Sequence, residues 1–210
     1  MTRGRFITFE GGEGTGKSTQ VRLLSAYLSQ SGGDVVQTRE PGGSPSAEEI
    51  RQLLVTGEAN RWSPLAETLL FNAARVEHWR QVIAPALERG AHVLCDSFAD
   101  STIAYQAYAG GLDRRLVEQL HRLVMGSVDP DLTIILDLPA AEGLRRAASR
   151  RHAETRFERK GQEFHEKLRQ GFLDIAARAP GRCVVINAGH SIERVHAAVL
   201  EALKSRLGVV

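Results

Sequence analysis

A glycine-rich segment near the start of the chain constrains the possible fold more than any other part of the sequence. The segment Gly11-Gly12-Glu13-Gly14-Thr15-Gly16-Lys17-Ser18 fits the pattern G-x-x-x-x-G-K-[ST]. A short β-rich run at residues 6–9 precedes it, and apolar residues recur at helical spacing over residues 17–30. A strand, a glycine-rich loop and a helix in this order bind nucleotide phosphates through backbone N–H groups. The chain is therefore predicted to bind a nucleotide.

The residues of this loop have separate predicted tasks. Glycines allow the backbone to approach phosphate oxygens closely, and the N-terminus of the following helix adds a partial positive charge. We expect Lys17 to reach the β- and γ-phosphates and the Ser18 hydroxyl to be a ligand of Mg²⁺, the predicted cofactor. The predicted nucleotide-binding residues are Gly11, Gly12, Glu13, Gly14, Thr15, Gly16, Lys17, Ser18 and Thr19.

The composition is that of an ordinary globular domain and excludes several classes of protein. The 210 residues are 42% hydrophobic and 25% charged, so the chain can bury a full core and is not intrinsically disordered. The 27 basic and 25 acidic residues nearly balance, unlike those of a dedicated nucleic-acid binder. Two cysteines are too few for a disulfide framework or a four-cysteine zinc site. We expect one domain spanning residues 1–210 that binds no nucleic acid.

The sequence also lacks the signals of a membrane or secreted protein. No run of apolar residues approaches the length of about 18 that indicates a membrane-spanning helix. The N-terminal sequence passes from Arg3 and Arg5 directly into the first predicted strand, without the apolar segment of a secretory signal. We therefore expect a cytoplasmic protein with reduced cysteines and no membrane partner.

Short apolar runs alternate with longer amphipathic segments along the rest of the chain. Five of these runs are predicted strands, and the continuous run LTIILDL at 132–138 indicates a central one. A capping box, Ser46-Ala47-Glu48-Glu49, indicates the start of one helix, and Pro85 is expected to bend another. The alternation predicts an α/β fold with a five-stranded parallel sheet and helices on both faces. The predicted strands are 6–9, 34–38, 91–96, 132–138 and 182–187, and the predicted helices are 17–30, 46–55, 64–89, 99–107, 113–126, from 140, 161–178 and 191–206.

A phosphate-binding loop alone does not identify the reaction, but other classes that share it need features absent from this sequence. Switch GTPases need Asp-x-x-Gly after a strand and a guanine-binding Asn-Lys-x-Asp, whereas this chain has Asp96-Ser97-Phe98-Ala99 and no Asn-Lys-x-Asp. Partitioning ATPases carry a second lysine early in the loop, and here no lysine precedes Lys17 in it. Motor ATPases are longer. The remaining class of protein is a small kinase that phosphorylates a small molecule.

Further segments resemble thymidylate kinases, and the resemblance covers essentially the whole chain. The most specific are Thr38-Arg39-Glu40-Pro41-Gly42-Gly43 and the stretch from Asp96 through Ser101-Thr102-Ile103-Ala104-Tyr105-Gln106. The resemblance implies the P-loop nucleoside-monophosphate-kinase fold, ATP-dependent phosphorylation of dTMP to dTDP, and a homodimer. The supporting segments are Phe9-Glu10-Gly11 with Glu13, Leu70-Phe71-Asn72-Ala73-Ala74-Arg75, Leu136-Asp137-Leu138-Pro139, Arg156-Phe157-Glu158 and Ile186-Asn187-Ala188.

The same resemblance implies the acceptor site. Phe71 and Arg75 are four residues apart and share one helix face, where a ring and a donor suit a pyrimidine base. Phe71 is expected to stack on thymine, and Tyr105 to crowd a ribose 2′-hydroxyl and so favour deoxyribose. Glu13 is expected to contact the acceptor 3′-hydroxyl or help hold Mg²⁺, and Arg39 to face the acceptor phosphate. The predicted substrate-binding residues are Glu13, Arg39, Pro41 (in a tight turn with a cis peptide bond), Phe71, Arg75, Ser101, Thr102, Tyr105 and Gln106.

An arginine-rich segment at residues 150–160 is predicted to be a lid that closes over the phosphates. Phosphoryl transfer needs positioning and neutralisation of negative charge, so cations that arrive on closure are useful. The loop has no basic residue before Lys17, so the chain resembles the type of thymidylate kinase that supplies arginines from the lid. The predicted catalytic residues are Lys17, Asp96 (which organises Mg²⁺ through water), Arg150 and Arg156.

One residue departs from the family pattern. The family's Asp-Arg-aromatic motif uses its arginine to bridge the acceptor and donor phosphates, and this chain has Ser97 at that position. A serine hydroxyl carries no charge and cannot span the same distance. Either neighbouring arginines compensate, or the chain is a nucleotide-binding module with weak transfer activity, or Ser97 is an engineered or erroneous residue. A kinase for another nucleoside monophosphate is the remaining alternative.

Overall fold

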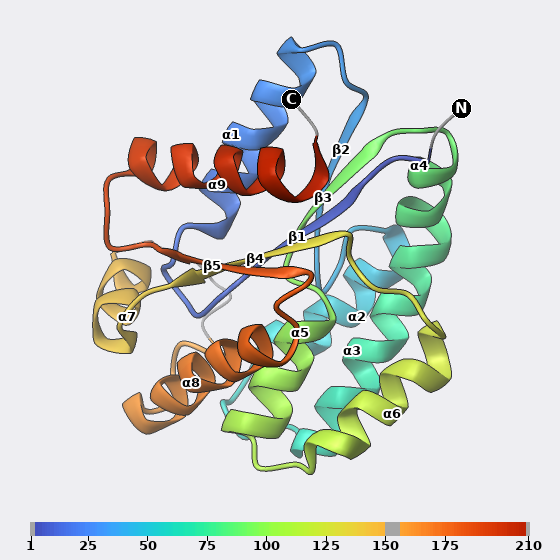
Figure 1. Ribbon diagram of the computed structural model, residues 1–210. Coiled ribbons are helices and arrows are strands. Elements are labelled where there is room, and N and C mark those ends of the chain that lie inside the picture. The colour runs from blue at the N-terminus through green and yellow to red at the C-terminus, as the bar shows by residue number, and fades with distance from the viewer. Residues whose placement is uncertain (1–2, 150–155, 209–210) are drawn as a thin grey trace.

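Five parallel strands form the centre of the molecule, as the sequence predicts. The structure is a computed structural model that describes residues 3–149 and 156–208 (Figure 1). The strand order is β2-β3-β1-β4-β5, so the most central strand is β1, and the apolar run in β4 lies beside it. The strands are β1 (Phe6–Glu10), β2 (Val35–Arg39), β3 (His92–Asp96), β4 (Leu132–Asp137) and β5 (Cys183–Asn187).

Helices that connect the strands cover both faces of this sheet. Figure 1 shows α1 and α9 on one side of the strands, with α3, α5, α6 and α8 on the other. The helical segments are α1 (Lys17–Gln30), α2 (Pro45–Val55), α3 (Pro64–His78), η1 (Trp79–Ile83), α4 (Ala84–Glu88), α5 (Ala99–Thr102), η2 (Ile103–Ala109), α6 (Arg114–Met125), α7 (Ala140–Ala148), α8 (Gln162–Arg178) and α9 (Ile192–Leu207).

The alternation of side chains along the strands builds a separate core on each face. In β1, Ile7 and Phe9 point to the face covered by α1 and α9, where Leu24 of α1 is fully buried. Phe6 points to the opposite face and packs with η1, α4 and β3. Five of the six residues of β4 are buried, as expected of a strand covered on both faces, which confirms that the apolar run there is a central strand.

The crossover of the chain determines where a ligand can bind. β1 pairs with β3 on one side and with β4 on the other, and Phe9 lies opposite both Asp96 and Ile134. In open parallel sheets, the loops that leave the carboxyl ends of strands at such a reversal point diverge and leave a crevice. The glycine-rich loop after β1 and the turn after β3 border this crevice.

The helix expected over residues 64–89 is three consecutive pieces with a π-helical turn in the middle. The Ala84 N–H donates to the carbonyl of Trp79, five residues back, instead of four. Pro85 follows directly, and a proline lacks the N–H of a regular helix and clashes with the carbonyl four residues before it. The π-helical turn is wider than an α-helical turn and accommodates Pro85. The irregularity expected at Pro85 therefore takes the form of a change from α-helix to π-helix. The helix expected at 99–107 likewise continues as the π-helical η2.

The capping box expected at Ser46 is wrong. Helix α2 begins one residue earlier, at Pro45, with Ser44 as its N-cap in an extended conformation. Proline favours the first helical position because its missing N–H would have no partner there. The Glu48 carboxylate accepts a hydrogen bond from the Gly43 N–H at 2.8 Å, so it fixes the preceding loop instead of the cap.

No helix in the two described ranges is long and apolar enough to cross a lipid bilayer.

The packing on the α1 face predicts a measurable loss of stability. Leu24→Ala is expected to lower the free energy of unfolding by about 2–5 kcal/mol, because Leu24 is 0% exposed and its removal leaves a cavity between α1 and the sheet. Leu53→Ala in α2 is the control, since that side chain is 40% exposed and should cost less than about 1 kcal/mol. Urea denaturation of both variants checks this, and equal losses would show that the α1 face is loosely packed.

Candidate active site

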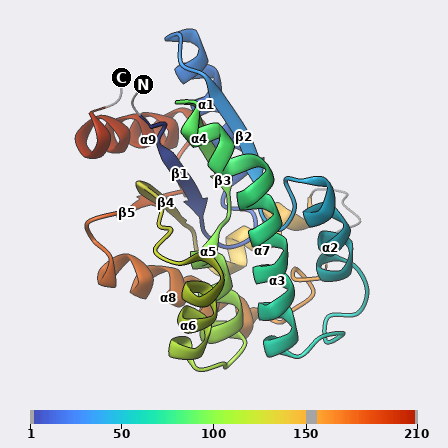
Figure 2. The same cartoon turned by 90° about the vertical axis from the view of Figure 1, so that its right-hand side faces the viewer.

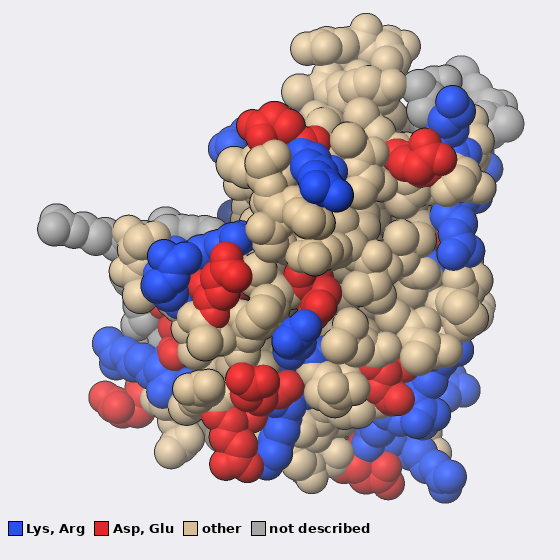
Figure 3. Space-filling view, turned by 60° about the vertical axis from the view of Figure 1, so that its left-hand side comes forward, with Lys and Arg blue, Asp and Glu red and all other residues tan. Residues whose placement is uncertain are grey.

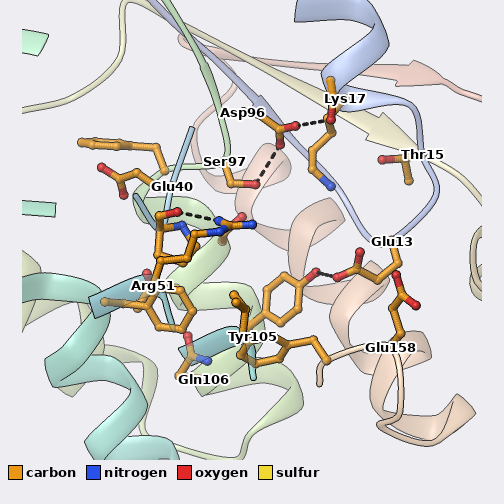
Figure 4. A pocket seen from close by; sticks show the side chains of 18 of the residues that line it. Glu13, Thr15, Lys17, Glu40, Arg51, Asp96, Ser97, Tyr105, Gln106 and Glu158 are labelled. Carbon is orange, nitrogen blue, oxygen red and sulfur yellow. Dashed lines mark hydrogen bonds between the residues drawn. The ribbon is translucent and has the colours of Figure 1, made fainter. Parts of the chain in front are cut away.

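A pocket of about 300 Å³ opens at the carboxyl ends of β1 and β3 (Figure 4). The glycine-rich loop, the turn after β3, helices α2 and α3, and η2 all contribute to its wall. Phe157 and Glu158, from the segment before α8, close it on one side. The pocket therefore brings together residues that lie up to 145 positions apart in the sequence, between Glu13 and Glu158.

The glycine-rich loop has the backbone that its sequence predicts. Gly11, Gly14 and Gly16 have φ values of 135°, 69° and 92°, which side chains rarely tolerate. The Lys17 ammonium donates to the carbonyls of Gly11 and Gly12, at 2.8 and 3.0 Å, and so closes the loop on itself. Residues Glu13 to Ser18 line the pocket, whereas Thr19 lies in the first turn of α1 and is not part of the lining.

Two side-chain oxygens that could bind a metal ion, from Ser18 and Asp96, lie side by side in the pocket wall. The Ser18 hydroxyl donates to the Asp96 carboxylate at 2.7 Å, which joins the start of α1 to the end of β3. Hydroxyl and carboxylate oxygens are the ligands that Mg²⁺ prefers, and Mg²⁺ in such sites takes most of its ligands from phosphates and water. The described residues contain no group of three or more His, Cys, Asp or Glu that could hold a metal ion by itself. The donor set fits a magnesium ion that arrives with a nucleotide.

The turn after β3 holds Ser97 in an unusual conformation beside Asp96. Ser97 has a φ of 69°, in the left-handed region, and its hydroxyl donates to Asp96 at 3.2 Å. The buried Glu10 carboxyl accepts hydrogen bonds from the Phe98 N–H and the Ser101 hydroxyl, so it holds the turn from the side of β1. Burial, with the nearby Asp100 carboxylate, raises the pKa of Glu10 to about 8. Ser101 lines the pocket, but its hydroxyl is engaged by Glu10.

Three aromatic side chains of the lining lie close to one another and form the aromatic half of the pocket. The Phe71 and Phe157 ring centroids are 6.1 Å apart, and those of Tyr105 and Phe157 are 5.4 Å apart. The Tyr105 hydroxyl donates to the Glu13 carboxylate at 2.8 Å, which connects this half to the glycine-rich loop. Phe71 therefore lies in the pocket, as its predicted stacking role requires.

Arg75 is buried at the end of this aromatic half and is almost fully hydrogen-bonded. Its guanidinium donates to Glu40 at 2.7 Å, to the Thr102 hydroxyl at 2.8 Å and to the Phe98 carbonyl at 3.1 Å. Among the described residues, its Nη1 has no hydrogen-bond partner. A buried, unpaired N–H group on the lining of a pocket is costly without a ligand, so this atom points to a bound acceptor.

Gln106 supplies the complementary atom. Its amide nitrogen donates to Glu67 at 3.0 Å, and within residues 3–149 and 156–208 its buried carbonyl oxygen has no partner. Figure 4 shows the Gln106 amide on the side of the pocket away from Lys17. The aromatic half thus presents one unpaired donor and one unpaired acceptor.

Arg156, one of the predicted catalytic residues, does not line the pocket. Its guanidinium is buried, pairs with Glu67, and donates to the carbonyls of Leu54, Glu58 and Ala59. These contacts use the N–H groups of the guanidinium and hold the segment around Arg156 against the end of α2 and the following loop. Arg150, the other predicted lid arginine, lies outside the described residues.

The predicted phosphate contact Arg39 also lies outside the pocket. Its side chain is 51% exposed and pairs with Glu48. Pro41 does line the pocket and follows a cis peptide bond, as suggested from the sequence. A further cation in the wall is Arg51 of α2, which donates to the Pro41 carbonyl and which the sequence analysis missed. Its helical spacing to the buried Ala47 and to the pocket residue Val55 was the available signal.

Comparison with known proteins identifies the family. The family model described as thymidylate kinase matches residues 9–199. The chain is 56% identical over its full length to the whole thymidylate kinase of Caulobacter vibrioides, and 50% identical over 98% of its length to 91% of the one from Afipia carboxidovorans. The crystal structure of thymidylate kinase from Ehrlichia chaffeensis has a TM-score of 0.79 and 41% identity over 96% of this chain and 99% of that one. Sequence, fold and pocket agree, and the chain belongs to the thymidylate kinase family.

Proposed function

We propose that the chain transfers the γ-phosphoryl group of ATP to dTMP, giving dTDP and ADP. The observation that carries this proposal is the pair of unpaired atoms in the aromatic half, Nη1 of Arg75 and Oε1 of Gln106. Thymine offers a carbonyl oxygen at position 4 and an N–H at position 3, on one edge of a flat ring. The Arg75 donor and the Gln106 acceptor match that edge, while Phe71 and Phe157 lie where a ring would stack.

The opposite end of the pocket suits the phosphates. Backbone N–H groups of the glycine-rich loop and the N-terminus of α1 favour anions there. The Lys17 ammonium, which contacts the loop carbonyls in this structure, is within the same loop and supplies the positive charge. Arg51 lines the wall between this end and the aromatic half, so the acceptor phosphate is proposed to lie between Arg51 and Lys17.

The proposed metal site consists of Ser18 with Asp96. A magnesium ion held there with ATP would neutralise charge on the β- and γ-phosphates. The role of the protein is to orient these two side chains. The β1–β3 pairing and the Ser97 turn do so, because they fix the end of the strand on which Asp96 lies.

The sugar is proposed to lie between Tyr105 and Glu13. These side chains are hydrogen-bonded to each other, and Phe172 also packs near the Tyr105 ring, so the ring is held in place. A fixed ring beside the sugar leaves little room for a 2′-hydroxyl, which supports the preference for a deoxyribonucleotide.

Two further features support the proposed cellular setting and partners. The free cysteines Cys95 and Cys183 are both buried, which fits a protein of the reducing cytoplasm. Figure 3 shows basic and acidic side chains interspersed over the face that it presents, without the continuous basic patch of a nucleic-acid interface. We therefore propose a cytoplasmic enzyme whose partners are ATP and dTMP.

A homodimer is also proposed, and exposed leucines on two neighbouring helices support one face as its interface. Helices α3 and α6 pack beside each other (Figure 2) and carry exposed leucines. Leu69 is 52% exposed and Leu123 is 82% exposed, and Leu65 and Leu116 extend the same apolar face. A second copy related by a twofold axis would bury both sets against each other.

Binding measurements test the choice of substrate. Ligands that bind the folded protein raise its melting temperature, so ATP and dTMP should each do so, and AMP and dGMP at the same concentration should not raise it through the acceptor site. A coupled assay for ADP should then show turnover with dTMP. A rise with ATP but with no monophosphate would replace the kinase by a nucleotide-binding module, and a preference for another monophosphate would reassign the substrate.

Lys17→Ala is expected to reduce transfer at least about a hundredfold while the melting temperature stays unchanged. Two charge-assisted phosphate contacts of about 1.5–3 kcal/mol each support this size of effect, and the side chain packs in no core cluster. The control is Lys167→Ala in α8, an exposed lysine paired with Glu163, which should leave transfer intact. Steady-state rates decide, and retention of turnover within about tenfold would contradict the loop assignment.

Phe71→Ala is expected to raise the KM for dTMP about tenfold or more and the KM for ATP less than twofold. Loss of stacking between a base and an aromatic ring costs about 1–3 kcal/mol. Phe71→Tyr keeps the ring and should keep the KM. Initial rates with each substrate varied at saturating concentration of the other provide the comparison, and parallel increases in both constants would mean that Phe71 only packs.

Ser97→Arg is expected to raise kcat/KM for dTMP at least about tenfold at saturating ATP. Ser97 lines the pocket beside Asp96, and the turn holds its backbone in the left-handed region, with a φ of 69°. A charged contact to the phosphates is worth about 1.5–3 kcal/mol. Ser97→Met is the control for length without charge and should give no gain. An unchanged or lower value for Ser97→Arg would show that another cation has taken over the role.

Leu69→Glu is expected to convert a dimer into a monomer, because two carboxylates would be buried at the proposed interface. Light scattering after size-exclusion chromatography measures the mass. The control is Ile192→Glu on α9, which is 54% exposed and lies on the opposite side of the sheet. A monomeric parent protein, or a dimer that survives Leu69→Glu, would refute this face as the interface.

A further inference from the structure

Glu67 is a buried carboxylate next to the pocket for which the transfer reaction has no direct use. It lies in the first turn of α3 and is only 3% exposed. One oxygen pairs with the Arg156 guanidinium, and the other accepts the Gln106 amide N–H at 3.0 Å. It does not line the pocket itself, so any effect on a ligand must pass through a neighbour.

The neighbour that it reaches is the Gln106 amide. An amide group has a donor end and an acceptor end, and it can face a pocket with either. A carboxylate paired with a guanidinium has only acceptors, so the NH₂ end of Gln106 must face Glu67. The carbonyl end is then left toward the pocket, where it is buried and without a partner among the described residues.

Arg156 fixes the position of the carboxylate. Besides Glu67 it donates to the carbonyls of Leu54, Glu58 and Ala59, which belong to the last turn of α2 and the following loop. A guanidinium with four such contacts cannot rotate without leaving buried groups unpaired, and that is costly. Glu67 is therefore held in one position, with its second carboxylate oxygen 3.0 Å from the Gln106 amide nitrogen.

We propose that Glu67 is a specificity-determining positioning residue: it orients the Gln106 amide and so makes the pocket select a pyrimidine with an N–H at position 3. Arg156 supports the same function by holding Glu67. This inference rests on the proposed function, since it concerns the base of the acceptor nucleotide.

The chemistry of the two common pyrimidine types explains the selection. Thymine and uracil carry a donor at position 3 and an acceptor at position 4, whereas cytosine carries an acceptor and a donor at those positions. Cytosine would place its ring nitrogen against the Gln106 carbonyl and its amino group against the Arg75 donor. Buried polar groups that are left unpaired in this way give discrimination of about 10⁴-fold in favourable cases.

A change from carboxylate to amide at position 67 removes the constraint. In Glu67→Gln, the new amide can donate as well as accept, so the Gln106 amide can turn over and present its NH₂ group to the pocket. We expect the ratio of kcat/KM for dTMP to that for dCMP to fall at least about tenfold, with the KM for dTMP raised and the KM for ATP changed less than twofold.

A control and a double-mutant cycle separate this effect from a general loss of structure. Thr68→Val removes a hydrogen bond from the neighbouring residue of the same helix turn and should leave the ratio unchanged. In a Gln106→Met background, Glu67→Gln should no longer alter the ratio, because its effect acts through that amide. If Glu67→Gln does not fold, Glu67→Gln/Arg156→Met, which removes both buried charges, is measured in its place with the same expectation.

Binding of dTMP and dCMP by calorimetry, beside the kinetics, makes the outcomes distinguishable. A parent that binds and phosphorylates dTMP, together with an unchanged ratio in Glu67→Gln, would overturn this inference and leave the proposed function intact. A change in the ratio that persists in the Gln106→Met background would also overturn it. A parent that neither binds nor phosphorylates dTMP would instead refute the proposed function.

Discussion

The parallel pairing of β1 with β3 is the constraint on which the site depends. It places Phe9 opposite Asp96, so the glycine-rich loop and the Ser97 turn leave the sheet side by side. The Ser18–Asp96 hydrogen bond and the contacts of Glu10 with Phe98 and Ser101 join the two segments. Both strands are buried on both faces, so the relative position of these segments is fixed by the core and not by the loops themselves. Preorganisation of this kind is what phosphoryl transfer asks of a protein.

Buried charges beside the pocket occur in pairs whose members come from distant parts of the chain. Arg75 pairs with Glu40, and Arg156 pairs with Glu67. Such pairs contribute little net stability, since their attraction must first offset the cost of removing both charges from water. Their effect here is orientation, because a paired group cannot turn without leaving a buried charge unpaired. This explains why the two buried atoms of the pocket lining that have no partner among the described residues, on Arg75 and Gln106, both belong to side chains held by a carboxylate.

The sequence predicts the fold closely, and each strand boundary agrees within one residue, because apolar runs and glycine-rich turns are local signals. The same holds for the loop that carries Lys17. The partners of long side chains are a different matter. The Arg39 side chain points to solvent, whereas the Arg51 side chain lines the pocket. Arg156 contacts a loop about a hundred positions earlier in the chain. The orientation of the Gln106 amide depends on Glu67, 39 residues away, which no spacing rule connects with it. Charge and size determined which residues were candidates, and tertiary packing determined which of them reached the pocket.

The balance of charge in the pocket gives a physical reason for the proposed metal and for the predicted effect of a charge at position 97. The described lining contains three cationic side chains, Lys17, Arg51 and Arg75, and four carboxylates, Glu13, Glu40, Asp96 and Glu158. Arg75 and Glu40 are paired with each other, so the remaining lining is net acidic although the ligands carry several negative phosphate charges. Neutralisation must therefore come largely from a bound cation, the backbone N–H groups of the loop and arginines beyond this lining. The side chain at position 97, next to Asp96, is uncharged and adds no positive charge to this net acidic lining. Arg156 does not supply that charge either, because its guanidinium pairs with Glu67 outside the lining.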